Sequence, residues 1–92
     1  MTDSNEHWIL RLDPHMVIEL IDLWDQLVVL CPNPREAVEH IALRTGMPAR
    51  SLHETRRTRN GCAHPRRLNG FPPSQLAKAV KTARTALDRL NP

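Results

Sequence analysis

The fold is decided by residues 14–31, which read PHMVIELIDLWDQLVVLC. One apolar stripe recurs along this segment at steps of three and four residues, as on one face of a helix: Val17, Leu20, Ile21, Trp24, Leu27 and Val28. A second stripe, Met16, Leu23 and Leu30, repeats every seven residues. A helix that is apolar on two sides has to be covered on two sides. In so short a chain we expect a second subunit to be one cover, although a central place in its own bundle would also suffice.

Proline and glycine mark the remaining elements. Asp13 and Pro14 form a helix start, in which the carboxylate caps free N–H groups and proline fits the first turn. Further helices are predicted from Asn33, the cap, to Thr45 with a stop at Gly46, from Pro48 to about Asn60, and from a Ser74 cap to Leu90. Residues 61–73 hold two glycines and three prolines and predict a loop or a broken helix. No segment alternates like a strand, so the fold class is all-α, an antiparallel bundle of four helices, or five.

Ninety-two residues predict a single domain, with residues 1–12 as an N-terminal arm. No run of about 18 apolar residues is free of charge, which argues against a membrane span, and the N-terminus is polar and acidic, unlike a signal peptide. We therefore expect a cytoplasmic protein. Cys31 and Cys62 are far apart in the chain and are expected to be reduced thiols, Cys62 as a small buried filler.

The net charge of +3 conceals an asymmetry along the chain. Residues 1–46 carry three arginines and eight acids, a formal charge of −5, whereas residues 47–92 carry ten cations and two acids, a charge of +8. Six arginines and one acid lie between Arg50 and Arg67. Basic charge gathered in one segment is typical of a protein with a polyanionic partner, although a solvated face gives the same composition.

Residues 58–65 contain a pattern with chemical meaning. Arg59 precedes His64 by five residues, and Asn60 follows the arginine directly. A histidine can remove the proton from a ribose 2′-OH at neutral pH, and a guanidinium can hold the phosphate that this oxygen attacks. Asn60 could position the phosphate or the imidazole. We expect Gly61 and Pro65 to end or kink the helix and so bring the two side chains together, because a spacing of five does not align them on a regular helix.

Four residues lie between Arg59 and His64, the first of them is Asn60, and the segment ends in Ala63-His64-Pro65. This pattern resembles the Arg-x4-His signature of HEPN domains. This resemblance implies a helical bundle that dimerises and forms one composite, metal-independent endoribonuclease site in a toxin or phage-defence setting. It implies Arg59, Asn60 and His64 as catalytic residues, no metal and no cofactor. The partners would be RNA, a second copy of the chain and an antitoxin or larger defence complex. Arg56, Arg57, Arg66 and Arg67 would bind the RNA.

The sequence departs from the family in two respects: the chain is short for the family, so that one helix would be abbreviated, and it lacks a tyrosine that some members carry. HEPN toxins that pair with a nucleotidyltransferase antitoxin carry a tyrosine two residues after the histidine, where this chain has Arg66 and contains no tyrosine at all. Control by modification of that tyrosine is therefore excluded. Some HEPN-like domains bind or dimerise without cutting RNA, which leaves a non-catalytic module as an alternative.

A different motif overlaps the arginine-rich segment. Residues 38–55 also fit a helix-turn-helix frame, with Gly46 at the turn and Leu52 in the second helix. The second helix would then place Arg50, His53, Arg56 and Arg57 in a DNA major groove. A zinc site from Cys31, His53, Cys62 and His64 is a weaker alternative, because Cys-x-His is not a usual ligand spacing.

Overall fold

The computed structural model describes residues 14–63 and 72–91. Within them the chain forms four α-helices and one 3-10 turn and no strand: α2 (Pro14–Val29), η1 (Pro34–Glu36), α3 (Ala37–Thr45), α4 (Ala49–Cys62) and α6 (Pro73–Leu90). This confirms the all-α class and the four helices. The expected N-terminal arm, the Asp13 cap and a fifth helix lie outside the described residues.

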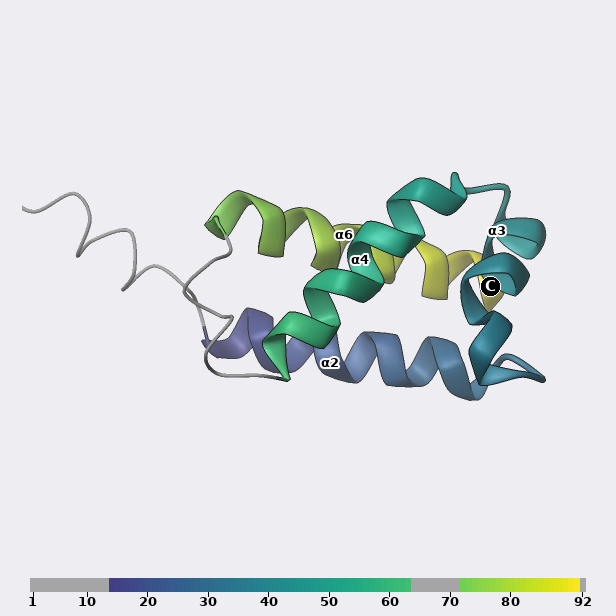
Figure 1. Cartoon of the computed structure of the whole chain (residues 1–92), viewed down its shortest axis with the longest axis horizontal. Coiled ribbons are helices and arrows are strands. Elements are labelled where there is room, and N and C mark those ends of the chain that lie inside the picture. Colours follow the sequence, from purple (N-terminus) through teal and green to yellow (C-terminus); the bar gives the residue numbers. More distant parts are fainter. Residues whose placement is uncertain (1–13, 64–71, 92) are drawn as a thin grey trace, which may run out of the picture.

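The three long helices do not all alternate in direction. In Figure 1, α2 and α6 run the same way, and α4 runs back across them at an angle, while the short α3 lies at one end. The antiparallel prediction therefore holds for α4 against each neighbour and is wrong for α2 against α6. The reason is the length of α3. With only nine residues it lies at one end of the bundle and does not run back along α2, so α4 is the helix that returns and α6 then runs in the same direction as α2.

Local signals set most helix boundaries. Asn33 is a cap, as predicted, because its side chain accepts a hydrogen bond from the backbone N–H of Arg35 at 3.1 Å. Its side-chain amide also donates to Glu36 at 2.7 Å. It caps the 3-10 helix η1, however, and α3 begins only at Ala37, later than predicted. Gly46 ends α3 with φ of 75°, a left-handed conformation that glycine adopts without a steric penalty. The Ser74 cap is wrong, because α6 begins one residue earlier with Pro73 in its first turn.

The core is built around α2. Leu20, Leu23, Trp24 and Leu27 are buried, and α2 makes its most extensive contacts with α6, which buries Leu76, Val80 and Ala83. The predicted stripe of Leu76, Val80 and Ala83 on the last helix is thus confirmed, with Leu87 and Leu90 only partly buried. Of the second stripe on α2, Leu23 is buried, whereas Leu30 is 46% exposed, because it follows the last turn of the helix.

Helix α4 attaches to this core with few apolar side chains. Leu52 is fully buried, but Ala49, the other predicted core residue, is exposed at the first position of the helix. Thr55 and Thr58 are buried instead, and their hydroxyls donate to the carbonyls of Ser51 and Glu54 at 2.8 and 2.9 Å. A buried threonine with its hydroxyl satisfied in this way packs like a small apolar residue.

We expect the Leu52→Ala variant to lower the free energy of unfolding by about 2–5 kcal/mol, because Leu52 is fully buried and is the large aliphatic side chain with which α4 fills the core. Urea denaturation followed by circular dichroism measures this loss. Leu43→Ala is the control, since Leu43 is 84% exposed and its truncation should change stability by less than about 0.5 kcal/mol. Equal losses in the two variants would contradict the placement of α4.

Candidate RNA-binding and cleavage site

Arg59 lies where α4 passes α2. Its Nη2 atom donates to Oδ1 of Asp25 on α2 at 3.0 Å, and the two side chains are 25% and 57% exposed. The Nε atom of Arg59 is buried and, among the described residues, has no hydrogen-bond partner. The guanidinium is therefore anchored at one corner and partly open to solvent, with donors not used by Asp25.

The side chains next to Arg59 on α4 differ in their surroundings. Asn60 is exposed, whereas Gly61 and Cys62 are buried and still belong to the helix. The helix therefore continues two residues beyond the predicted end and does not kink at Gly61. Ala63, the C-cap, is the last described residue before the segment that begins with His64. His64, Pro65, Arg66 and Arg67 lie outside the described residues, so the approach of His64 to Arg59 stays a prediction.

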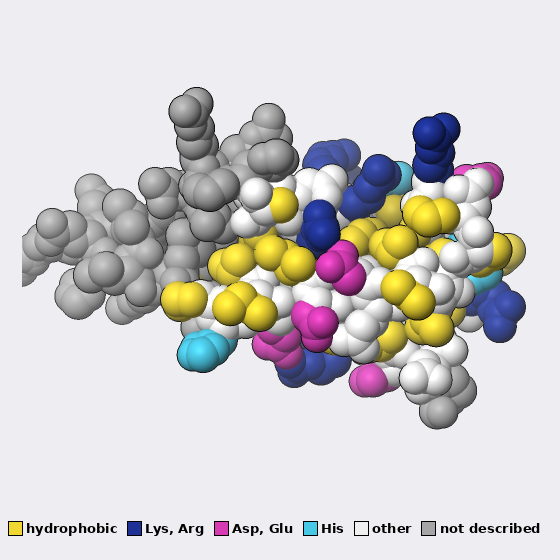
Figure 2. Space-filling model, turned by 90° about the horizontal axis from the view of Figure 1, so that it is seen from below, with side chains coloured by type: hydrophobic (Ala, Val, Ile, Leu, Met, Phe, Trp, Pro, Cys, Tyr) yellow, Lys and Arg dark blue, Asp and Glu magenta, His cyan; other side chains and the backbone are white. Residues whose placement is uncertain are grey.

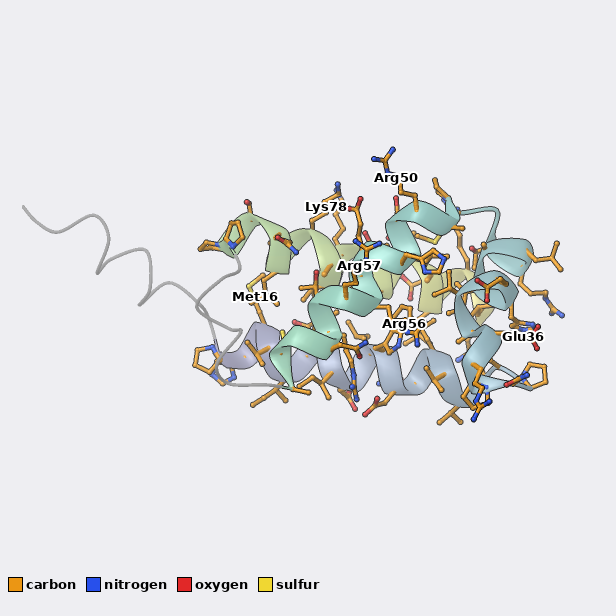
Figure 3. The ribbon with its side chains drawn as sticks, viewed as in Figure 1. Met16, Glu36, Arg50, Arg56, Arg57 and Lys78 are labelled. Atoms are coloured by element: carbon orange, nitrogen blue, oxygen red, sulfur yellow. The ribbon has the colours of Figure 1, made fainter. Side chains whose placement is uncertain are left out.

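Arg56 and Arg57 are both exposed but lie on different sides of α4. Arg56 is three residues before Arg59 and so shares its side of the helix, which faces α2 (Figure 3). Arg57 shares the outward face with Arg50, seven residues earlier (Figure 3). Within the described part of the chain neither Arg56 nor Arg57 has an acidic partner, whereas Arg50 lies 3.9 Å from Glu54. The two expected RNA-binding arginines that the structure describes, Arg56 and Arg57, thus lie on different sides of α4.

A polar contact joins α4 to the start of α6, close to the motif. The side chain of Gln75 donates to the buried hydroxyl of Thr58 at 3.1 Å. Thr58 precedes Arg59 directly, and Gln75 lies near the first turn of α6, so this bond holds together the two helices on either side of residues 64–71. A shallow groove beside it is lined by Ser51, Glu54, Thr55, Thr58, Gln75, Lys78, Ala79 and Thr82. Lys78 adds a cation from α6 to the edge of the arginine surface.

Two of these contacts could not be found in the sequence. Asp25 is 34 residues from Arg59 and Gln75 is 17 residues from Thr58, and nothing in the spacing of either pair relates one residue to the other. Asp25 is one of the few polar residues in an apolar helix. That signal indicates a surface position and does not identify the partner.

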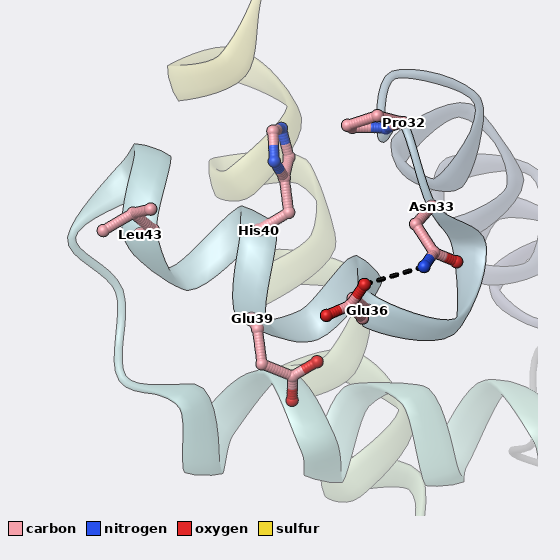
Figure 4. A pocket seen from close by; sticks show the side chains of 6 residues that line it. All are labelled: Pro32, Asn33, Glu36, Glu39, His40 and Leu43. Carbon is pink, nitrogen blue, oxygen red and sulfur yellow. Dashed lines mark hydrogen bonds between the residues drawn. The ribbon is translucent and has the colours of Figure 1, made fainter.

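A second pocket lies away from the motif, at the other end of the bundle. It is lined by Pro32, Asn33, Glu36, Glu39, His40 and Leu43, from η1, α3 and the turn before them (Figure 4). Glu39 also lies 3.7 Å from Nε2 of His53 on α4. Among the described residues no three His, Cys, Asp or Glu side chains are grouped so that they could hold a metal ion. In the same residues no helix is long and apolar enough to cross a membrane.

Both cysteines are free and buried, as expected for Cys62. Burial raises the pKa of the Cys62 thiol, and the nearby positive charge of Arg59 offsets part of this increase. Burial also raises the pKa of Cys31, whose thiol donates to the carbonyl of Leu27 at 3.2 Å. Both groups are therefore protonated at neutral pH and shielded from reagents.

We expect native protein at pH 8 to react with a thiol-specific disulfide reagent at least about tenfold more slowly than the same chain in urea, because a raised pKa lowers the thiolate fraction and burial limits access. The rate of absorbance change after mixing measures this. A Cys31→Ala variant isolates Cys62. Equal rates in the native and unfolded chains would show that the thiols are accessible.

Comparisons of the chain with protein-family models, with curated proteins and with solved structures found no match. Membership of the HEPN family is thus a prediction that rests on residues 59–65. The geometry around Arg59 is a separate observation.

Proposed function

We propose that this chain is a metal-independent endoribonuclease of HEPN type that acts as a homodimer. Arg59 would hold the phosphate, Asn60 would position it, and His64 would act as general base or acid. The observation that supports this most directly is the state of Arg59, which is anchored by Asp25 and is partly open to solvent. An anionic oxygen would satisfy the donors that Asp25 does not use.

The proposed reaction needs only groups of the protein and the RNA. His64 takes the proton from a ribose 2′-OH, and this oxygen forms a bond to the adjacent phosphorus as the bond from phosphorus to the 5′-oxygen breaks. The leaving 5′-oxygen receives a proton from the protonated His64, which returns the histidine to its starting state, and the products are a 2′,3′-cyclic phosphate and a 5′-OH. The guanidinium of Arg59 stabilises the charge that builds on the phosphate oxygens. The hydrogen bond from Arg59 to Asp25 would hold the guanidinium in position before the substrate binds.

The surface around Arg59 suits a single-stranded polyanion. Helix α4 carries Arg50, Arg56, Arg57 and Arg59 against Glu54 alone, a formal charge of +3. Arg56 and Arg57 are exposed, and Lys78 of α6 lines the groove between α4 and α6. These exposed cations could bind phosphates of an RNA strand on either side of the phosphate that Arg59 holds. A toxin or phage-defence setting, with an antitoxin or a larger complex as partner, belongs to this proposal through the resemblance alone.

One observation favours a second candidate, a helix-turn-helix DNA-binding protein. Residues 46–48 form a three-residue turn between α3 and α4, and Arg50, His53 and Arg57 follow at steps of three and four along α4. The side chain of Arg50 is 92% exposed and that of His53 is 44% exposed. Such a helix face could enter a major groove. This candidate gives Arg59 and His64 no role.

We expect purified protein in EDTA to cut single-stranded RNA and to leave 5′-OH ends that a polynucleotide kinase can label. The His64→Ala and Arg59→Ala variants should each lose about 10²- to 10³-fold in cleavage rate, because each removes a group that acts in the transition state. Asn60→Ala should lose less. Denaturing gels of end-labelled RNA measure the rates.

Asp25→Asn is the matched control for Arg59→Ala. It weakens the same ion pair but leaves the guanidinium in place, and it should retain cleavage within about tenfold. If His64→Ala and Arg59→Ala cut as fast as the parent, the catalytic assignment is wrong. A dimer that binds RNA but never cuts it would identify the non-catalytic module.

We also expect Arg56→Ala and Arg57→Ala to weaken RNA binding, each lowering the slope of log affinity against log salt by about 0.7. Fluorescence anisotropy over a range of salt concentrations measures the slope. Arg35→Ala is the control, because Arg35 is exposed in η1 and lies outside α4. Tight, sequence-selective binding to duplex DNA that Arg50→Ala abolishes and His64→Ala leaves unchanged would favour the helix-turn-helix candidate instead.

A further inference from the structure

Asn60 is exposed and is followed directly by glycine, and this pair of residues can react with itself. The backbone nitrogen of Gly61 attacks the side-chain carbonyl carbon of Asn60. The new C–N bond closes a succinimide ring, the bond to the side-chain nitrogen breaks, and that nitrogen leaves as ammonia with the proton that Gly61 gave up. Water then opens the ring at either carbonyl and leaves aspartate or isoaspartate, which is negatively charged. Glycine has no side chain to hinder the ring closure.

The fold holds the pair in a conformation that opposes this reaction. Both residues belong to the last turn of α4, which ends at Cys62. The N–H of a helical residue points at the carbonyl four residues earlier, so the nitrogen of Gly61 is directed away from the side chain of Asn60 until the turn opens. The attacking nitrogen also has to lose its proton, as it does in amide hydrogen exchange. The rate should therefore follow the fraction of molecules in which this turn is open.

The hydrogen bonds that close the turn are shared ones. The N–H of Ala63 donates both to the carbonyl of Arg59 at 3.3 Å and to that of Asn60 at 3.2 Å, an arrangement common at helix ends. Glycine inside the turn lowers the helix propensity further. The backbone around Asn60 is thus held less firmly than the middle of α4.

Tertiary contacts hold the same turn from the other side. Gly61 and Cys62 are buried, and Thr58, next to Arg59, accepts a hydrogen bond from Gln75 of α6 at 3.1 Å. Opening of the turn would therefore expose the thiol of Cys62 and would be easier without the bond from Gln75. These two groups provide a way to observe the opening and a way to change it.

A carboxylate at position 60 would lie among the arginines of α4. Arg56 and Arg57 are four and three residues earlier and so are its neighbours on the helix surface. Among the described residues neither of them has an acidic partner, so a new negative charge would pair with them. The negative end of the helix macrodipole would also repel this charge and loosen the turn. The conversion would thus neutralise part of the surface that binds a polyanion.

We propose that Asn60 is a site of spontaneous deamidation in the folded protein and that opening of the last turn of α4 sets the rate. The aspartate or isoaspartate formed there weakens RNA binding by neutralising Arg56 and Arg57. Water is the only co-reactant. The loss of RNA binding rests on the proposed function, whereas the reaction and its control by the helix rest on the Asn60-Gly61 pair and its place in α4.

Incubation of the full chain at about pH 8, folded and in guanidinium chloride, tests the reaction. Trypsin cleavage after Arg59 and Arg66 releases residues 60–66, whose one asparagine is Asn60, and mass spectrometry separates the asparagine, aspartate and isoaspartate forms of this peptide. We expect the folded chain to react at least about tenfold more slowly than the unfolded chain, because only its open fraction reacts.

Asn33 is the control within the same chain, because Pro34 after it has no N–H to form the ring, and it should stay unmodified in both states. Equal rates at Asn60 in the folded and unfolded chains would overturn the control by the helix. A folded chain in which Asn60 is unmodified after the unfolded chain has reacted completely would overturn the site.

The Gln75→Ala variant tests the link to the opening of the turn. Without the bond to Thr58, deamidation of Asn60 and the reaction of Cys62 with a disulfide reagent should both become about two- to tenfold faster in the folded chain, with Cys31→Ala as background. Gln26→Ala is the matched control, because it removes a 3.0 Å side-chain bond to Asp22 within α2 and should change neither rate. A faster reaction of Cys62 with no change at Asn60 would contradict the link.

The effect of the new charge is measured by comparing Asn60→Asp with Asn60→Ala, since both remove the amide and only the first adds a carboxylate. With a labelled single-stranded RNA, the slope of log affinity against log salt should be smaller by about 0.7 in Asn60→Asp, as expected for one lost phosphate contact. Equal slopes would overturn the loss of binding. A parent chain that binds no RNA would refute the proposed function and this consequence together, while mass spectrometry decides the reaction at Asn60 independently.

Discussion

The constraint on which this structure depends is the burial of α2. Leu20 and Leu27 of this helix are fully buried, and Leu23 and Trp24 nearly so, which is possible only if other elements pack along more than one side. Helix α6 covers one side over its length and α4 crosses another, while α3 closes an end. Ile18 and Val29, by contrast, are exposed on the side of α2 that faces away from these elements (Figure 2). The packing of these elements on α2 therefore determines both the arrangement of the bundle and which side of α2 is exposed.

Helix α4 shows how a mostly polar helix can still be part of a core. Leu52 supplies its large buried aliphatic side chain, and Thr55 and Thr58 fill the remaining contact with hydroxyls that bond to their own helix. Because so little of α4 is needed for packing, its arginines are free to face outward. Asp25 then restrains one of them, Arg59, at the seam between α4 and α2. An exposed ion pair of this kind adds little stability, so its main consequence is the orientation of the guanidinium.

Much of the fold could be predicted from local signals. The helical spacing of the α2 stripe, the Asn33 cap and the left-handed Gly46 each act within a few residues, and the structure confirms them. The direction of α6 relative to α2 could not be obtained in this way, since it depends on how the short α3 packs. The burial of Thr55 and Thr58 was also missed, because composition identifies threonine as polar and cannot show that its hydroxyl is satisfied internally.

For the candidate site, the sequence by itself determined which residue types are present: which segment carries the arginines, which residue follows Arg59, and that Cys62 is a small residue suited to burial. Only the tertiary structure decided that Asp25 anchors Arg59, that Gln75 bonds to Thr58, and that Arg56 and Arg57 lie on different sides of α4 with respect to α2. The physical reason is the range of the forces involved. Helix periodicity and capping act between residues a few positions apart, whereas the crossing of two helices results from the packing of the whole core, to which every buried side chain contributes.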